Sequence, residues 1–428
     1  MEYKPLQVPA SAGFTGSHVE GGVCVAAGFK AGAVHAGFQP DPDRLDLAMV
    51  VADEPAAVAG VFTTNVFCAA PVTVDREHIA QSGYARAFVA NTKYANAATG
   101  EPGLRNAYKT ADMVASILDC PAEQVLVAST GIIGQHLNMD TMQAGLPKVA
   151  AALGRDLEIN DYACARAIMT TDTRPKEAAV TFSGDGVGYD GCTFTVGGMA
   201  KGSGMIMPNM ATMIAVITTD APIASNALHD ALVRAVDVSF NKVTVDSDTS
   251  TNDSCFLFAS GEAAPQGAPS FDPSGLAFAR FEQALHAVCQ NLARAMAADG
   301  EGATRLVTVN VSGAATDQDA DAAARAVANS PLVKTAVFGH DANWGRIAAA
   351  IGKSGAAFRQ EDAAIDIMGM PVCRGGLTVA FDEDEALRRF EEAEIVIDVD
   401  LGAGNSETTV WTCDFTHDYI TINGDYRS

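Results

Sequence analysis

Short, almost wholly apolar segments separated by glycines recur along the whole chain. They are LDLAMVVA (45–52), QVLVAS (124–129), ATMIAVIT (211–218), RLVTVNV (305–311) and EIVIDVDL (394–401). A strand with one face in water alternates polar and apolar residues, whereas a strand that is apolar throughout is buried on both faces. The segments therefore predict strands, and the most apolar of them predict sheets that are covered on both sides.

Helical patterns lie between the predicted strands, and the clearest is FEQALHAVCQNLARAMA (281–297). Its apolar stripe comprises Leu285, Val288, Cys289 and Leu292. Together these elements predict an α+β fold with sheets sandwiched between helical layers. The acidic turn NVSGAATDQDADAAA (310–324) suits the entry to a smaller C-terminal unit, and DYITING (418–424) predicts a last strand that ties down the end of the chain.

Composition and charge narrow the classes of protein. With 428 residues, 48% hydrophobic and 19% charged, the chain can bury a large core in two or three domains or in one layered body. The formal charge of −24, from 52 acidic and 28 basic residues, repels a phosphate backbone or an anionic membrane. We therefore expect neither nucleic acid nor a membrane as a partner.

Cysteine and histidine usage gives no framework for disulfides or metals. The nine cysteines are odd in number and scattered without a CxxC pair, which predicts buried thiols in a reducing compartment. The eight histidines include no HxxxH pair, so no metal site is predicted. The first residues lack a signal-peptide pattern, and no apolar run reaches the roughly 18 residues that span a bilayer. We expect a cytoplasmic protein.

The segment KGSGMIMPNMATMIAVITTDA (201–221) places a hydroxyl residue, Thr212, at the start of an apolar run. The glycines and proline before it predict a tight, strained loop, and a buried strand is predicted after it. At such a junction a chain can cut itself, because the Thr212 Oγ can attack the carbonyl of Ala211 in an N-to-O acyl shift and water can release the ester. The alternative is that Thr212 merely begins a strand.

Cleavage would give Thr212 both a hydroxyl and a free α-amine, whose ordinary pKa is about 7.7–8.0. One residue would then supply the nucleophile and its own general base. This fits a sequence without a GxSxG nucleophile elbow. The segment GDGVG (184–188) lacks the lysine and the spacing of a phosphate loop, so it predicts a hairpin turn.

The segment around Thr212 resembles the signature of the ornithine acetyltransferase family, also called glutamate N-acetyltransferase. The resemblance extends over nearly the whole chain, with blocks in the family's order. They include GVFTTN (60–65), ANAATGEPGL (95–104), ASTGIIG (128–134), IMTTDTRPK (168–176), VTVDSDTSTNDS (243–254), DGEGATRL (299–306), FGHDANWGRI (338–347) and the terminal YITINGDYRS. The block 243–254 has no direct role in this interpretation and is expected to be polar packing near the active site.

The resemblance implies an oxyanion hole and a substrate pocket. The Thr130 side chain and the Gly131 N–H would stabilise the oxyanion. Lys201 would contact the substrate, as would a threonine of the 169–173 segment; we favour Thr170, but the residues do not separate it from Thr171. The remaining implied site residues are Glu301, which could bind the amino group of the substrate, together with Asn423 and Ser428.

The implied fold is a layered αββα sandwich of the N-terminal-nucleophile type with a smaller C-terminal α/β domain from about residue 305. The implied reaction moves an acetyl group from N-acetyl-L-ornithine to L-glutamate through an acetyl-Thr212 enzyme, without a cofactor, although acetyl-CoA could serve as a co-substrate. The fragments 1–211 and 212–428 would stay together as α and β chains, commonly as α₂β₂. The alternatives are an N-terminal-nucleophile aminopeptidase or amidase, and an unprocessed, non-catalytic relative.

Overall fold

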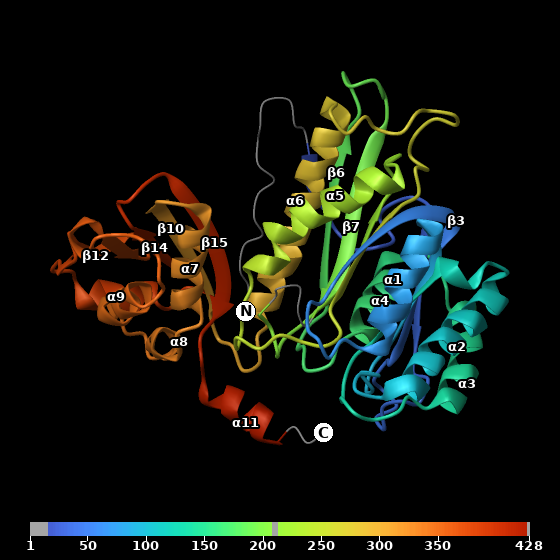
Figure 1. Cartoon of the computed structure of the whole chain (residues 1–428), viewed down its shortest axis with the longest axis horizontal. Helices are drawn as coiled ribbons and strands as arrows, with labels where there is room; N and C mark the ends of the chain where they lie inside the picture. The colour runs from blue at the N-terminus through green and yellow to red at the C-terminus, as the bar shows by residue number, and fades with distance from the viewer. Residues whose placement is uncertain (1–15, 208–212, 426–428) are drawn as a thin grey trace.

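The computed structural model describes residues 16–207 and 213–425, which form two bodies, each built on one sheet (Figure 1). The strands of the first body are β1 (Gly16–Val19), β2 (Phe29–Val34), β3 (Leu47–Phe62), β4 (Tyr84–Asn91), β5 (Val125–Ser129), β6 (Lys176–Ser183), β7 (Thr193–Lys201), β8 (Ile214–Thr219) and β9 (Ser254–Ala259). Its α-helices are α1 (Ala70–Ser82), α2 (Gly100–Leu118), α3 (Met139–Ala151), α4 (Tyr162–Ala167), α5 (Ser225–Asp237) and α6 (Leu276–Ala298).

The first sheet has the strand order β1-β6-β7-β8-β9-β3-β4-β5, and β2 also pairs with β3. The long strand β3 belongs to both halves of this sheet. Its first part pairs with β2 and β4, its last part pairs with β9, and the register shifts between Val51 and Ala56. An irregularity of this kind bends a strand and lets one sheet turn its two halves toward each other.

Alternating side chains show that the two halves are stacked. On β8 and β9, Val216 and Phe256 belong to an apolar cluster that also contains Phe88 of β4 and Leu126 of β5, so this cluster fills the space between the halves. The outer face of β6 to β9 packs under α5 and α6, and the outer face of β3 to β5 packs under α1, α2 and α3 (Figure 1). The order is helix, sheet, sheet, helix, which confirms the predicted αββα sandwich.

The second body holds six strands and five α-helices among the described residues. The strands are β10 (Leu306–Ala314), β11 (Ala364–Ile367), β12 (Met370–Arg374), β13 (Leu377–Thr378), β14 (Glu394–Asp400) and β15 (Ser406–Cys413). The helices are α7 (Asp317–Ala328), α8 (Pro331–Phe338), α9 (Trp344–Gly352), α10 (Glu383–Arg389) and α11 (His417–Asp425). The sheet order is β13-β12-β11-β14-β10-β15, with β10 parallel to β14. Residues of α7 to α10 bury its apolar face.

The predicted helix 281–297 lies inside α6, and its stripe of four apolar residues is fully buried. The predicted strand 418–424 is wrong, because this segment is helix α11 and pairs with no strand of either described sheet. Its β-branched residues have no pleated neighbour to pack on, and Ile420 is 71% exposed. No helix in the described ranges is long and apolar enough to cross a membrane.

Candidate functional site

A cavity of about 150 Å³ lies where the ends of β5 and β7 meet the segments that follow α6 and precede β9. All the predicted site residues that the structure describes line it, although they are far apart in the sequence. They are Thr130, Gly131, Thr170, Thr171, Lys201, Glu301 and Asn423. The other three, Ala211, Thr212 and Ser428, lie outside the described residues.

The predicted oxyanion turn follows β5 directly. The backbone N–H of Thr130 donates to the Asn91 carbonyl at 3.0 Å, so this amide is occupied and only the Thr130 hydroxyl remains for a ligand. In the described ranges no backbone carbonyl accepts from the Gly131 N–H. Gly131 has φ +129°, and an added Cβ would lie 2.4 Å from the carbonyl group of Lys93. The turn therefore requires glycine, since a side chain fits neither the dihedral nor the space.

Lys201 ends β7 and reaches the cavity as a buried cation with only 3% of its surface exposed. Burial lowers the pKa of Lys201, while the nearby carboxylates of Asp172, Asp253 and Glu301 act in the opposite direction. A buried ammonium is a strong electrostatic partner for an anion, because little water screens it. Lys201 can therefore hold a carboxylate that enters the cavity.

A second buried lysine, Lys176, stabilises the segment 169–173, which contains Thr170 and Thr171. The Nζ of Lys176 lies 2.6 Å from one oxygen of Asp172 and 2.6 Å from one oxygen of Asp299. Asp172 also accepts hydrogen bonds from the backbone N–H groups of Thr170 at 3.0 Å and Gly202 at 2.7 Å. Burial opposes ionisation of Asp172, but the neighbouring lysines outweigh it and hold its pKa below the ordinary value. This ion-pair network joins Thr170 and the end of β7 into one rigid wall.

Glu301 lies in the turn after α6 and lines the same cavity as Lys201. Its carboxylate accepts a hydrogen bond from the Asn423 Nδ2 at 2.7 Å, which brings α11 to the site. Its backbone N–H donates to the Ser203 carbonyl at 3.1 Å. A Cβ on Gly204 would lie 2.3–2.4 Å from the carboxylate atoms of Glu301, so the absence of a side chain there makes room for the carboxylate.

Sequence reasoning named no role for three residues that shape this site: Asn252, Asp172 and Lys176. The Asn252 side chain lines the cavity and donates to the carbonyls of Ala95 at 2.5 Å and Ser129 at 2.8 Å. Asp172 and Lys176 stand four residues apart within the block 168–176, but this segment is not helical and contains Pro175, so the helical spacing rule does not indicate their ion pair. Within residues 16–207 and 213–425 no group of three His, Cys, Asp or Glu side chains is arranged to hold a metal.

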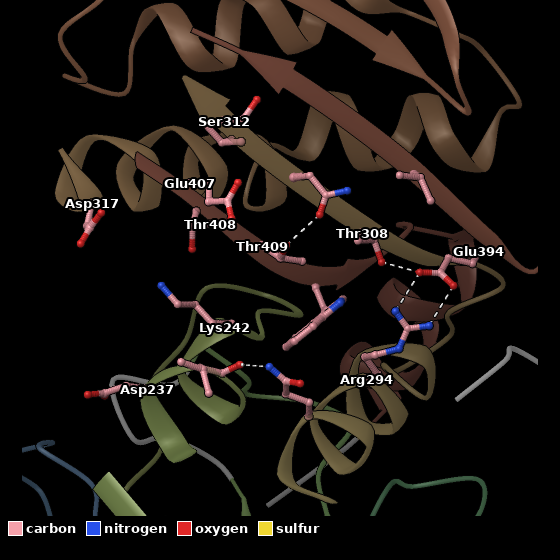
Figure 2. A pocket seen from close by; sticks show the side chains of 16 residues that line it. Asp237, Lys242, Arg294, Thr308, Ser312, Asp317, Glu394, Glu407, Thr408 and Thr409 are labelled. Atoms are coloured by element: carbon pink, nitrogen blue, oxygen red, sulfur yellow. Dashed lines mark hydrogen bonds and ion pairs between the residues drawn. The ribbon is translucent and has the colours of Figure 1, made fainter. Parts of the chain in front are cut away.

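A larger cavity, of about 1180 Å³, lies between α6 and the polar face of the second sheet (Figure 2). Some of its polar side chains are paired with one another. Arg294 binds both carboxylate oxygens of Glu394, at 2.9 and 2.8 Å, and the Thr308 hydroxyl donates to the same carboxylate at 2.6 Å (Figure 2). No predicted site residue lines this cavity. The smaller cavity is therefore the candidate active site.

Two comparisons of the sequence with known proteins give the same family. Residues 30–428 match the ArgJ family model. The arginine biosynthesis bifunctional protein ArgJ of Symbiobacterium thermophilum is 47% identical over 409 residues, which are 95% of this chain and 99% of the relative. The protein of the same name from Nitratidesulfovibrio vulgaris is 46% identical over 402 residues, 94% of this chain and 98% of the relative.

Among solved structures, the ornithine acetyltransferase of Mycobacterium tuberculosis complexed with ornithine aligns with 37% identity and a TM-score of 0.41, over 45% of this chain and 98% of that chain. The family model and the two full-length relatives confirm the resemblance drawn from the sequence blocks. On that evidence, this chain belongs to the ArgJ family.

Proposed function

We propose that this chain is a self-cleaving acetyltransferase of arginine biosynthesis that transfers an acetyl group from N-acetyl-L-ornithine to L-glutamate. The observation that carries the proposal is the cavity itself, where a buried cation, a carboxylate and a threonine-glycine turn converge. Its volume of about 150 Å³ suits an amino acid and not a macromolecule.

In the first reaction, the Thr212 Oγ attacks the carbonyl carbon of Ala211, and the bond from that carbon to the Thr212 nitrogen breaks as the nitrogen takes up a proton. The resulting ester is hydrolysed by water, which leaves a carboxylate on Ala211 and frees the Thr212 hydroxyl and α-amine. The fragments 1–211 and 212–428 then act as α and β chains, and we propose an α₂β₂ assembly.

In the second reaction, the Thr212 Oγ attacks the acetyl carbonyl of N-acetylornithine while its α-amine takes the hydroxyl proton. The oxyanion is stabilised by the Thr130 hydroxyl and the Gly131 N–H, each worth about 2.7–4 kcal/mol in comparable sites. The occupied N–H of Thr130 supports this choice of donors. Ornithine leaves with that proton and glutamate enters. Its amine attacks the acetyl carbon and gives up a proton, and the Thr212 oxygen leaves that carbon and takes the proton back.

The two charged groups of the cavity match an amino acid. We propose that Lys201 binds the α-carboxylate and that Glu301, held by Asn423, binds an amino group of the substrate; Thr170 or Thr171, and Ser428, complete the pocket. Because ornithine and glutamate share the α-amino-acid unit, one pocket serves both half-reactions. Acetyl-CoA as a second acetyl donor and a cytoplasmic location remain predictions.

The deciding experiment compares the wild-type protein with Thr212→Ala by intact mass under denaturing conditions. We expect two wild-type fragments, one beginning at Thr212, and a single uncut species of 44.3 kDa for the variant. Ornithine release is then assayed with and without glutamate. An active but uncut wild-type protein would refute self-cleavage. A rate of ornithine release that is the same with and without glutamate would indicate a hydrolase instead of a transferase.

A further inference from the structure

A fully buried carboxyl group, that of Asp253, lies beside the residue that follows Thr212. Asp253 is 0% exposed and immediately precedes β9. Its Oδ1 accepts a hydrogen bond from the backbone N–H of Met213 at 2.7 Å, and the Met213 carbonyl accepts from the Ser254 N–H at 3.0 Å. Both backbone polar groups of Met213 are therefore held by two consecutive residues, Asp253 and the first residue of β9.

The other carboxylate oxygen of Asp253, Oδ2, is buried and has no hydrogen-bond partner in the described ranges. Burial raises the pKa of Asp253 well above its ordinary value, although the Met213 N–H and the charge of Lys201 act in the opposite direction. A buried carboxyl with an unused oxygen costs folding free energy. Strand β8 starts only at Ile214, so the bond to Met213 extends the order of β8 by one residue toward Thr212.

The residue before Asp253, Asn252, is bonded to the segment that carries the predicted oxyanion donors. Asn252 donates to the carbonyl of Ser129, which is the last residue of β5 and directly precedes Thr130. One short segment, 252–253, is thus bonded both to the neighbour of Thr130 and to the neighbour of Thr212. Such a segment can fix the distance between a nucleophile and its oxyanion donors.

We propose that Asp253 is a positioning residue, which fixes the backbone of Met213 and thereby orients the residue before it, Thr212, for both self-cleavage and acetyl transfer. The inference rests on the proposed function, because it requires Thr212 as the nucleophile. A misplacement of about 1 Å in an active site can lower a rate by about 100-fold. The effect of losing the bond should therefore appear in rates and not in substrate binding.

The test uses Asp253→Ala, which removes the acceptor, and Asp253→Asn, whose amide oxygen can still accept from the Met213 N–H. We expect Asp253→Ala to slow self-cleavage and to lower kcat by about 100-fold with KM for N-acetylornithine little changed. Asp253→Asn should restore most of both rates. The fraction cut is followed by denaturing mass spectrometry, and kcat is measured per fully cut molecule.

Asp75→Ala is the matched control for stability. Asp75 is also 0% exposed, accepts one backbone N–H, from Val127 at 2.8 Å, and has an unpartnered Oδ2. We expect both alanine variants to lose similar thermal stability, and only Asp253→Ala to lose cleavage and kcat. Equal losses of rate in the two variants, or wild-type rates in Asp253→Ala, would overturn the inference, as would an Asp253→Asn variant as slow as Asp253→Ala.

Thr212→Ala, made in parallel, separates the two proposals. If Thr212→Ala is uncut and inactive while Asp253→Ala behaves like the wild type, only the positioning role fails. If Thr212→Ala is cut and active, the proposed nucleophile fails and the positioning role fails with it.

Discussion

The substitution Gly204→Ala tests whether the missing side chain at Gly204 makes room for the carboxylate of Glu301. An added Cβ at Gly204 would lie 2.3–2.4 Å from the carboxylate atoms of Glu301. Ordinary contacts between such atoms are about 3.5 Å or longer, so the carboxylate would have to retreat by about 1 Å. Gly204 is not in a left-handed conformation, and its backbone therefore accepts alanine without strain. The end of the flexible Glu301 side chain is what moves.

This displacement should remove the hydrogen bond from Asn423 to Glu301, now 2.7 Å long, and misplace the carboxylate relative to the substrate. The bond that matters for kcat/KM is the one we propose between the substrate amino group and Glu301, and a hydrogen bond to a charged group contributes about 1.5–3 kcal/mol. At 1.4 kcal/mol for each factor of ten, we expect kcat/KM for N-acetylornithine to fall by about 10- to 150-fold. We expect self-cleavage to continue, because the proposed cut uses only Thr212, Ala211 and water.

Steady-state kinetics with N-acetylornithine and glutamate measures this change, and thermal unfolding shows whether the fold is intact. Gly352→Ala is the control, because an added Cβ there meets nothing within 4 Å. A Gly204→Ala enzyme with the kcat/KM of Gly352→Ala would refute the argument that Gly204 makes room for a functional Glu301.

Two further predictions concern buried charges. Lys176→Met should lower the free energy of unfolding by about 3–5 kcal/mol, because it leaves the carboxylates of Asp172 and Asp299 buried without their cation; a loss under about 1 kcal/mol in urea unfolding would contradict the network. Burial, together with the charge of Asp161, raises the pKa of Glu177 to about 7. The folded state thus binds this proton more tightly than the unfolded state, so the free energy of unfolding should fall as pH rises from about 4.5 to about 7. The variant Glu177→Gln should therefore show a flatter Tm-against-pH curve over this range. A variant curve as steep as that of the wild type over this range would count against the assignment.

The layers of the fold could be predicted from the sequence because burial leaves a local signal. Segments such as 124–129 and 394–401 are strands, and the stripe of 281–297 is the buried face of α6. Segment 418–424 was mispredicted because its β-branched residues are typical of a strand, whereas the deciding fact is the lack of a neighbouring strand. Pairing partners are set by the tertiary fold and not by the local pattern.

The residues of the site could be predicted from the sequence, but the contacts that hold them in place could not. Thr130, Lys201 and Glu301 were identified through the family resemblance, and they line one cavity. The contacts that hold them join residues far apart in the sequence: Lys176 is paired with Asp299, and Asn252 with Ser129. Nothing in the sequence around Lys176 or Asn252 indicates these partners. A buried ion pair, or a hydrogen bond from a side-chain amide, depends on which chain segments the fold brings together.

The strand order of the first sheet has a consequence for a chain that is cut before residue 212. Strands β8 and β9 come after that position in the sequence but lie in the middle of the sheet, between β7 and β3, which come before it. The piece 1–211 alone would thus have a sheet with a gap two strands wide and two exposed apolar edges. Folding of the intact chain must therefore precede the cut. After such a cut the two polypeptides would be joined by strand pairing on both sides of the gap, and neither could leave unless the core between the sheet halves unfolded.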